Sequence, residues 1–311
     1  MSRAPQTGEL SRPDVARDLD ACAALARAHY ENFAVGSRLL PRALRLPLAA
    51  VYATVRIADD LADEGHGGPE AAAAIDAFER ELERAVAGER VEHFALRACG
   101  AVIRAFGLPL PAFHALFRAF RRDTVQCRYA SYDELLGYCR DSADPVGRLV
   151  LALFGRHEPA LHAASDAICT GLQLVNHWQD VAADARRGRI YLPQEDLARF
   201  GVDEAALLRG EDSPALRALV AFETARAREL LERGASLVAA TRGRLRFEVA
   251  LFRRGGLAAC DALERAGCAV MQGPPRLTAR DRAGAVLRAV TDLLRPTARR
   301  APRALAEETA S

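Results

Sequence analysis

One segment, residues 48–63, reads LAAVYATVRIADDLAD, and it combines an apolar helical pattern with three acidic side chains at one end. A helix turns by about 100° per residue, so Asp59 and Asp63 share one face. Acidic side chains are rare on the apolar side of a helix unless a cation or a polar ligand offsets the cost of removing them from water. The segment therefore predicts a buried helix that presents carboxylates to a ligand.

A second segment, residues 172–184, repeats this arrangement in the sequence LQLVNHWQDVAAD. Its helical spacing places Gln173, Asn176, Asp180 and Asp184 in one polar column among apolar residues. A single Asp pair at this spacing is commonly a solvated face or an ion pair with Arg, but two such pairs and an amide column favour a shared site. Mg²⁺ is often held by one or two carboxylates while phosphate and water fill its other positions. The two segments together predict a Mg²⁺ site that clamps a diphosphate.

The composition favours a single large helical domain. Hydrophobic residues make up 50% of the 311 residues, and no linker-like stretch divides the chain. We predict a disordered N-terminal segment over residues 1–13, one domain over 14–295 and a flexible tail over 296–311. Residues 188–212 are expected to be irregular, and 188–200 to form a lid over the ligand. Helices are predicted over 14–30, 48–63, 70–87, 91–106, 110–128, 132–141, 145–155, 159–186, 213–240, 244–267 and 277–294.

Charge and cysteine content limit the possible partners and compartments. The net charge of +2 is too small to indicate a nucleic-acid partner, and every fixed basic side chain is Arg. The seven cysteines are scattered without a CxxC pair, as in a reducing cytoplasm. No signal peptide or membrane-spanning run is visible. For the amphipathic stretch 283–294, packing against the bundle is expected, with peripheral docking on a membrane surface as the alternative.

Several motifs carry a resemblance to a known family. They are HYENF at residues 29–33, YATVRIADDLAD at 52–63, YCRDSADPVG at 138–147 and RIYLPQEDL at 189–197, together with the polar column described above. In this combination the chain resembles the squalene/phytoene synthase family over roughly residues 20–295. The finer features are similar to those of the bacterial hydroxysqualene synthases of hopanoid pathways, the HpnC type.

The resemblance implies an all-α isoprenoid synthase fold, a single helical bundle with a central apolar cavity. It implies that the two acidic clusters hold Mg²⁺ and are catalytic, and that Tyr138 lies near the reacting carbons. The implied metal ligands are Asp59, Asp60, Asp63, Asp180 and Asp184. The implied substrate-binding residues are Arg56, Gln173, Asn176, Val146, Gly147, Phe33, Arg189 and Tyr191.

Three functions follow from the resemblance. The first is hydroxysqualene synthase, which ionises and rearranges presqualene diphosphate and captures water; functional coupling to the enzymes before and after it in squalene biosynthesis is then expected. The second is a synthase that condenses two prenyl diphosphates head to head. Residues 30–32 depart from the Ser-x-Ser pattern of carotenoid-type relatives, which favours the first. The third, a scaffold without activity, is disfavoured because all five aspartates are present.

Overall fold

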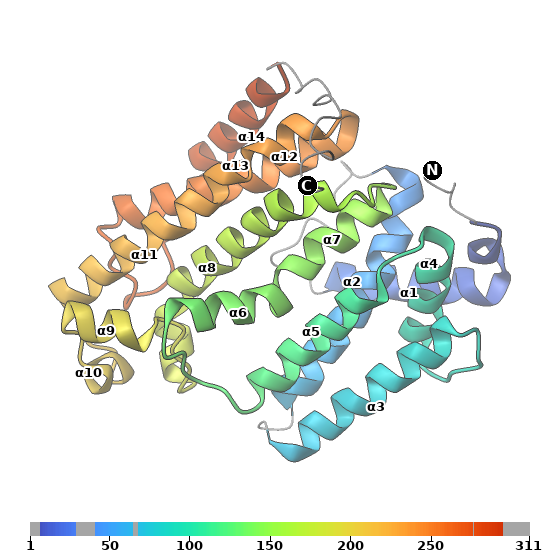
Figure 1. Cartoon of the computed structure of the whole chain (residues 1–311), viewed down its shortest axis with the longest axis horizontal. Helices are drawn as coiled ribbons and strands as arrows, with labels where there is room; N and C mark the ends of the chain where they lie inside the picture. Colours follow the sequence, from blue (N-terminus) through green and yellow to red (C-terminus); the bar gives the residue numbers. More distant parts are fainter. Residues whose placement is uncertain (1–6, 29–40, 65–67, 276, 295–311) are drawn as a thin grey trace, which may run out of the picture.

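The computed structural model describes residues 7–28, 41–64, 68–275 and 277–294, and every regular element within these ranges is a helix (Figure 1). The predicted all-α fold class is therefore confirmed. The helices of the first half are α1 (Pro13–Ala28), α2 (Arg42–Glu64), α3 (Pro69–Val86), α4 (Phe94–Phe106), α5 (Leu110–Asp123), α6 (Tyr132–Ser142) and α7 (Asp144–Leu153). Those of the second half are α8 (His162–Arg186), α9 (Gln194–Phe200), α10 (Glu204–Leu208), α11 (Pro214–Arg233), α12 (Ala235–Ala240), α13 (Gly243–Arg265) and α14 (Ala279–Leu294).

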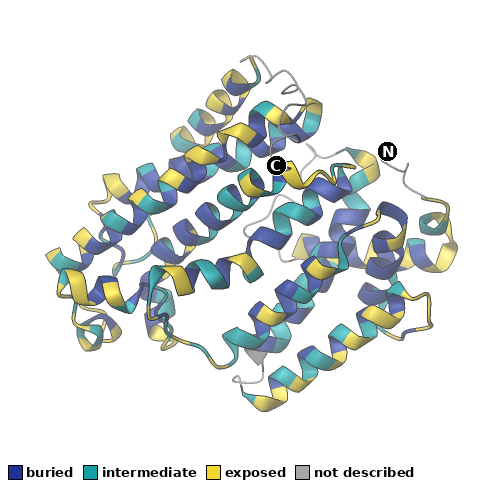
Figure 2. Cartoon of the chain, viewed as in Figure 1, coloured by how far each residue is buried: buried dark blue, intermediate teal, exposed yellow. Residues whose placement is uncertain are grey.

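The buried apolar side chains form two separate cores. One core joins α1 to α5 and one side of α7, and the other surrounds α8 and joins it to α6 and to the C-terminal helices. Val150 and Phe154, at the end of α7, pack against both cores. Figure 2 shows the buried residues along the inner sides of the helices in both halves. The two halves are therefore joined through α7, and the fold leaves space for a cavity between them.

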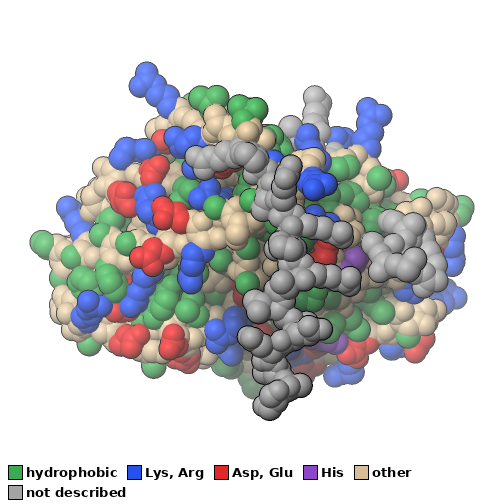
Figure 3. All heavy atoms as spheres, turned by 45° about the horizontal axis from the view of Figure 1, so that its top comes forward, with side chains coloured by type: hydrophobic (Ala, Val, Ile, Leu, Met, Phe, Trp, Pro, Cys, Tyr) green, Lys and Arg blue, Asp and Glu red, His purple; other side chains and the backbone are tan. Residues whose placement is uncertain are grey.

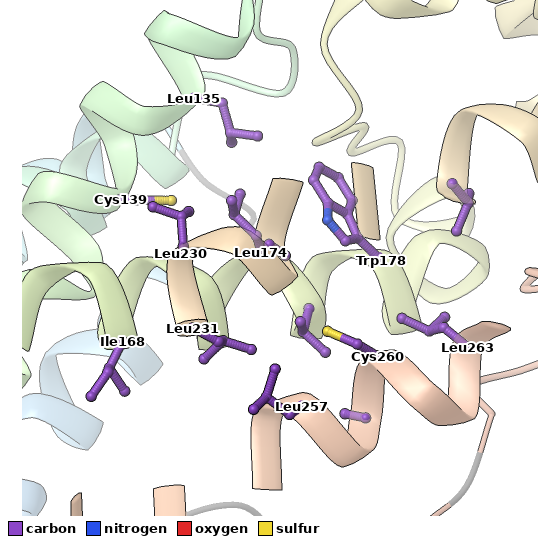
Figure 4. Close-up of a cluster of buried hydrophobic side chains, with 14 of the residues drawn as sticks. Leu135, Cys139, Ile168, Leu174, Trp178, Leu230, Leu231, Leu257, Cys260 and Leu263 are labelled. Atoms are coloured by element: carbon purple, nitrogen blue, oxygen red, sulfur yellow. The ribbon is translucent and has the colours of Figure 1, made fainter. Parts of the chain in front are cut away.

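The second core is built around α8 (Figure 4). Trp178 is fully buried there and lies among leucines of α8, α11 and α13. Glycines allow these helices to approach closely. A Cβ on Gly256 would lie 2.7 Å from Leu172 Cδ2, and one on Gly171 would lie 3.1 Å from the carbonyl oxygen of Ala227. The predicted apolar side of α8 is thus fixed in the core, so its polar column must face the other way.

Three predicted boundaries are wrong. Helix α2 begins at Arg42 and therefore contains Pro47. Proline has no N–H, so the carbonyl of Ala43 lacks its helical hydrogen bond. Ala43 is exposed in the first turn of the helix, where water can replace this bond. The helix predicted over 213–240 breaks at Gly234, where a Cβ would collide with Ile168. The stretch 188–212 is not irregular throughout, since it contains α9 and α10; the Asp203 side chain caps α10.

The N-terminal prediction is also wrong in part. Residues Thr7–Ser11 form a 3-10 helix, and Arg104 Nε donates to Glu9 at 3.1 Å, which ties this turn to α4. The ordered region therefore starts before the predicted residue 14, while residues 1–6 and the tail 296–311 lie outside the described ranges. None of the helices in the described ranges is both long and apolar enough to cross a membrane.

We predict that the contact between α3 and α4 depends on Gly100. A Cβ at this position would lie 2.8 Å from the backbone carbonyl of Ala85, which cannot move aside as a side chain can. Gly100→Ala should lower the free energy of unfolding, measured by chemical denaturation, by about 1–3 kcal/mol. Gly255 is the matched control because its added Cβ meets nothing within 4 Å. Gly255→Ala should be neutral or stabilise by up to about 1 kcal/mol, and equal losses in both variants would contradict this account.

Candidate functional site

A cavity of about 570 Å³ lies at the junction of the two halves. Its wall is mainly apolar, with a few polar side chains that come from α2, α5, α6 and α8. This matches the central apolar cavity expected from the resemblance. The lining residues are Ala28, Leu48, Val51, Tyr52, Val55, Arg56, Asp59, Leu116, Phe120, Asp123, Tyr138, Ser142, Val146, Leu149, Val150 and Gln173.

Helix α2 brings its carboxylates and Arg56 to this cavity. Arg56 Nη2 donates to Asp60 Oδ1 at 2.5 Å, and its Nη1 lies 3.5 Å from Asp59 Oδ2. The Nε–H of Arg56 is buried and has no acceptor among the described residues. One guanidinium is thus shared between two carboxylates at the edge of the cavity, a position suited to binding phosphate oxygens. Asp63 lies on the same helix, but its side chain is outside the described set.

Helix α8 carries the polar column along its open face. Gln173 lines the cavity, Asn176 and Asp180 are exposed, and Asp184 is half-buried. From Gln173 to Asp184 the column extends about 16 Å along the helix axis, at 1.5 Å per residue. Burial, to which the charge of Asp180 adds, raises the pKa of Asp184 to about 6. The column therefore starts in the cavity wall and ends at a carboxyl group that is costly to ionise on its own.

These carboxylates fit a divalent cation that is shared with a substrate. Among the described residues, no three His, Cys, Asp or Glu side chains come together as an all-protein metal site. Mg²⁺ does not require such a site, because it commonly uses one or two carboxylates and takes its other ligands from phosphate and water. A cation near Asp180 and Asp184 would also offset the burial and the charge of Asp180 that raise the pKa of Asp184. The donor set therefore suits Mg²⁺ bound together with a diphosphate.

An aromatic cluster closes one side of the site. The His177 and Tyr191 rings stack with their centroids 3.7 Å apart, and the Tyr138 ring lies 5.9 Å from that of Tyr191 and 5.4 Å from that of Tyr129. Burial lowers the pKa of His177 to about 3, so its ring is neutral near pH 7. The cluster offers aromatic faces next to an apolar cavity, an environment that stabilises a cation without attacking it.

Asp123 is a functional candidate that the sequence reasoning missed. It is the last residue of α5, it lines the cavity, and its Oδ2 accepts a hydrogen bond of 2.9 Å from the Tyr138 hydroxyl. Burial, together with the charge of Asp123, raises the pKa of Tyr138 well above its usual value, so the hydroxyl stays protonated. No sequence signal at position 123 pointed to the cavity, because this Asp follows two arginines and looks like an ordinary charged helix end.

The segment that follows α8 forms part of the wall. Ile190 N donates to Cys127 O at 3.0 Å, and Gln194 N donates to Tyr129 O at 2.9 Å. Through this pairing, Arg189 and Tyr191 border one small crevice with Asp184 and His177. The segment 188–193 is therefore packed into the body of the protein, and none of residues 188–200, the predicted lid, lines the cavity.

The remaining predicted residues lie in different places. Val146 lines the cavity, whereas Gly147 lies at the contact between α7 and α8, where a Cβ would be 2.6 Å from Cys169 Sγ. Gly147 thus allows α7 to approach α8, and its role in substrate binding stays a prediction. Phe33 lies outside the described residues.

Comparisons with known proteins agree with this geometry. A model of the squalene/phytoene synthase family matches residues 26–282. The chain belongs to the squalene/phytoene synthase family. A hydroxysqualene synthase of Sinorhizobium fredii is 36% identical over 225 residues, which are 71% of this chain and 75% of that protein. A 15-cis-phytoene synthase of Synechococcus elongatus is 34% identical over 227 residues, 68% of this chain and 72% of that protein.

A solved structure supports the same assignment. The crystal structure of squalene synthase HpnC from Alicyclobacillus acidocaldarius superposes with a TM-score of 0.77 at 41% identity, over 83% of this chain and 98% of that one. This member of the squalene/phytoene synthase family therefore has the isoprenoid synthase helical fold, and it is an enzyme of a family that acts on prenyl diphosphates.

We predict that His177 makes the stability of this family member depend on pH. Its pKa is lowered in the folded state, so below about pH 6.5 the unfolded chain binds a proton that the folded chain does not, and stability falls as the pH falls. From about pH 7 to about pH 5.5, the free energy of unfolding of the wild type should fall by about 1 kcal/mol more than that of His177→Phe. Denaturant titrations at both pH values measure this difference, and parallel losses would show that His177 is not buried neutral.

Proposed function

We propose that the protein is a hydroxysqualene synthase that converts presqualene diphosphate and water to hydroxysqualene and diphosphate. Similarity to the HpnC squalene synthase structure, at 41% identity over most of the chain, is the observation that carries this proposal. The similarity to the hydroxysqualene synthase of Sinorhizobium fredii, at 36% identity, supports it. The cavity adds a chemical reason, because it pairs an apolar interior with carboxylates and Arg56 at its edge.

The first step would be the departure of diphosphate from the cyclopropylcarbinyl carbon. Arg56 lines the cavity beside Asp59 and Asp60, so its guanidinium is placed to bind phosphate oxygens there. We propose Asp59, Asp60, Asp63, Asp180 and Asp184 as the residues that hold Mg²⁺. When bound, Mg²⁺ would neutralise the charge that develops on the leaving diphosphate. Gln173 and Asn176, on the same face of α8, would orient the diphosphate by hydrogen bonds.

The second step would take place in the interior of the cavity. Side chains such as Val51, Leu116 and Leu149 exclude bulk water from the rearranging cation. The hydrogen-bonded Asp123 and Tyr138 are polar groups within this wall. We propose that Asp123 holds the one water that ends the reaction. The water oxygen forms the new C–O bond, and its proton passes to the Asp123 carboxylate, so no reductant is needed.

A second candidate function is the head-to-head condensation of two prenyl diphosphates. The similarity to the phytoene synthase of Synechococcus elongatus, at 34% identity, favours it specifically. Both reactions use the same acidic clusters, and they differ in substrate and in the way the cation is consumed.

A direct assay separates the two functions. Purified protein is incubated with Mg²⁺ and either presqualene diphosphate or farnesyl or geranylgeranyl diphosphate, without nicotinamide cofactor, and the extracted products are identified by mass spectrometry. Hydroxysqualene from presqualene diphosphate alone is the expected result. Consumption of farnesyl or geranylgeranyl diphosphate alone would instead assign the condensing function.

The cysteines and the chemistry of the substrate also bear on the cellular setting. All seven cysteines are free thiols, as expected for a protein of the reducing cytoplasm, where we place it. Presqualene diphosphate is a long apolar chain with an ionic head, so we propose functional coupling to the enzyme that supplies it and to the one that consumes hydroxysqualene.

We predict that the acidic clusters are essential for turnover. Asp60→Asn and Asp180→Asn should each lower kcat/KM at least about a hundredfold, because each removes a carboxylate proposed to hold Mg²⁺. Circular dichroism should show unchanged helix content. Asp133→Asn is the matched control because Asp133 is exposed at the start of α6. Activity retained in both test variants would exclude the two-cluster site.

We predict that Asp123 controls the fate of the cation. With presqualene diphosphate, Asp123→Asn should still release diphosphate, while the fraction of hydroxysqualene among the products falls roughly tenfold. Ser142→Ala is the matched control, since Ser142 is another polar residue of the same wall. Diphosphate release measures the ionisation step, and ¹⁸O incorporation from labelled water measures the capture of water. An unchanged hydroxysqualene fraction in Asp123→Asn would contradict the assignment of Asp123.

A further inference from the structure

Helix α14 is fixed to the bundle by one face only. Ala285 and Ala289 are buried against the neighbouring helix α13. Asp292 is buried on the same side and accepts two hydrogen bonds of 2.7 Å from the Arg254 guanidinium. Its carbonyl oxygen also accepts a bond from Arg246. These contacts set the rotation of the helix, so its opposite face must point away from the protein.

This outward face is apolar. Val286, Leu287, Val290 and Leu294 are 44%, 66%, 42% and 81% exposed, and they are four of the six exposed large hydrophobic residues in the described ranges. At 100° per residue they fall within one third of the helix circumference, and the exposed Ala283 lies between them. Hydrophobic side chains gather at the top of the molecule in Figure 3, on the side where α14 lies in Figure 1. A continuous apolar face of this kind commonly marks an interaction surface.

The charged side chains of α14 that border this face are positive. The helical spacing places Arg280 along one edge of the apolar face and Arg282 along the other, and both are exposed. The acidic residues of α14 lie on the inner side, where Asp281 pairs with Arg265 at 2.8 Å and Asp292 with Arg254. The sequence that follows, residues 295–300, adds three arginines and no acid.

We propose that the outer face of α14 docks on a membrane surface rich in anionic lipid. An amphipathic helix that lies in the plane of the interface buries its apolar face below the headgroups, and flanking arginines bind the anionic headgroups. A symmetric pairing of two copies through this face would bring like-charged arginines together without an acidic partner, which is unfavourable. The charge pattern therefore favours lipid over a second copy. This proposal does not depend on which prenyl diphosphate the enzyme uses.

Vesicle co-sedimentation of the full chain tests the proposal. Vesicles of phosphatidylcholine with phosphatidylglycerol should bind the wild type, vesicles of phosphatidylcholine alone should bind it much less, and added salt should weaken binding. The double variant Leu287→Ser, Leu294→Ser should bind at least about tenfold more weakly. The double variant Arg280→Gln, Arg282→Gln should lose a similar factor on anionic vesicles only.

Val125→Ser is the matched control, because Val125 is 74% exposed and lies in the connection after α5. It should bind as the wild type does. Wild type that stays in the supernatant with both kinds of vesicle would overturn the proposal, as would unchanged binding of the leucine variant. Light scattering tests the alternative of a contact between two copies. If the wild type is a dimer and the double variant Leu287→Ser, Leu294→Ser is a monomer, the proposal is overturned in favour of that contact.

Discussion

The separation of the hydrophobic interior into two cores is the constraint on which the rest of the structure depends. A single packed core would leave no room for a ligand, because protein interiors are close-packed. Here α2 belongs to one core and α8 to the other, and each helix buries its apolar side in its own half. Their polar sides are left to border the cavity between the halves. The same packing that stabilises the halves thus places Arg56, Asp59 and Gln173 around one space.

The charges of the site follow from this placement. Asp60 and Asp59 lie close to Arg56, so the first cluster is partly neutralised within the protein. In the second cluster, burial and the charge of Asp180 raise the pKa of Asp184 to about 6, although Arg187 and Arg189 act in the opposite direction. A divalent cation that carries a diphosphate would offset the burial and the mutual repulsion of these two carboxylates. The site therefore combines carboxylates at the edge of the cavity with an apolar interior.

The sequence predicted those parts of the molecule that depend on local periodicity. The polar column from Gln173 to Asp184 lies on one side of α8, and Trp178 on the other, as the helical spacing required. Features that depend on contacts between distant segments were not predictable. The break at Gly234 reflects the proximity of Ile168, and the cavity position of Asp123 reflects its bond to Tyr138. The start of α2 was misplaced, because the helix begins at Arg42, ahead of the predicted residue 48, and includes Pro47.

We propose that the cavity between the two cores binds the prenyl chain while α2 and α8 together hold its diphosphate. The most direct test is a crystal structure with Mg²⁺ and a prenyl thiodiphosphate, which resists ionisation. We expect metal and diphosphate density between Asp59 and Asp60 on one side and Asp180 and Asp184 on the other, with the hydrocarbon beside Tyr138 and Asp123. A diphosphate bound away from either helix, or a hydrocarbon chain outside this cavity, would contradict it.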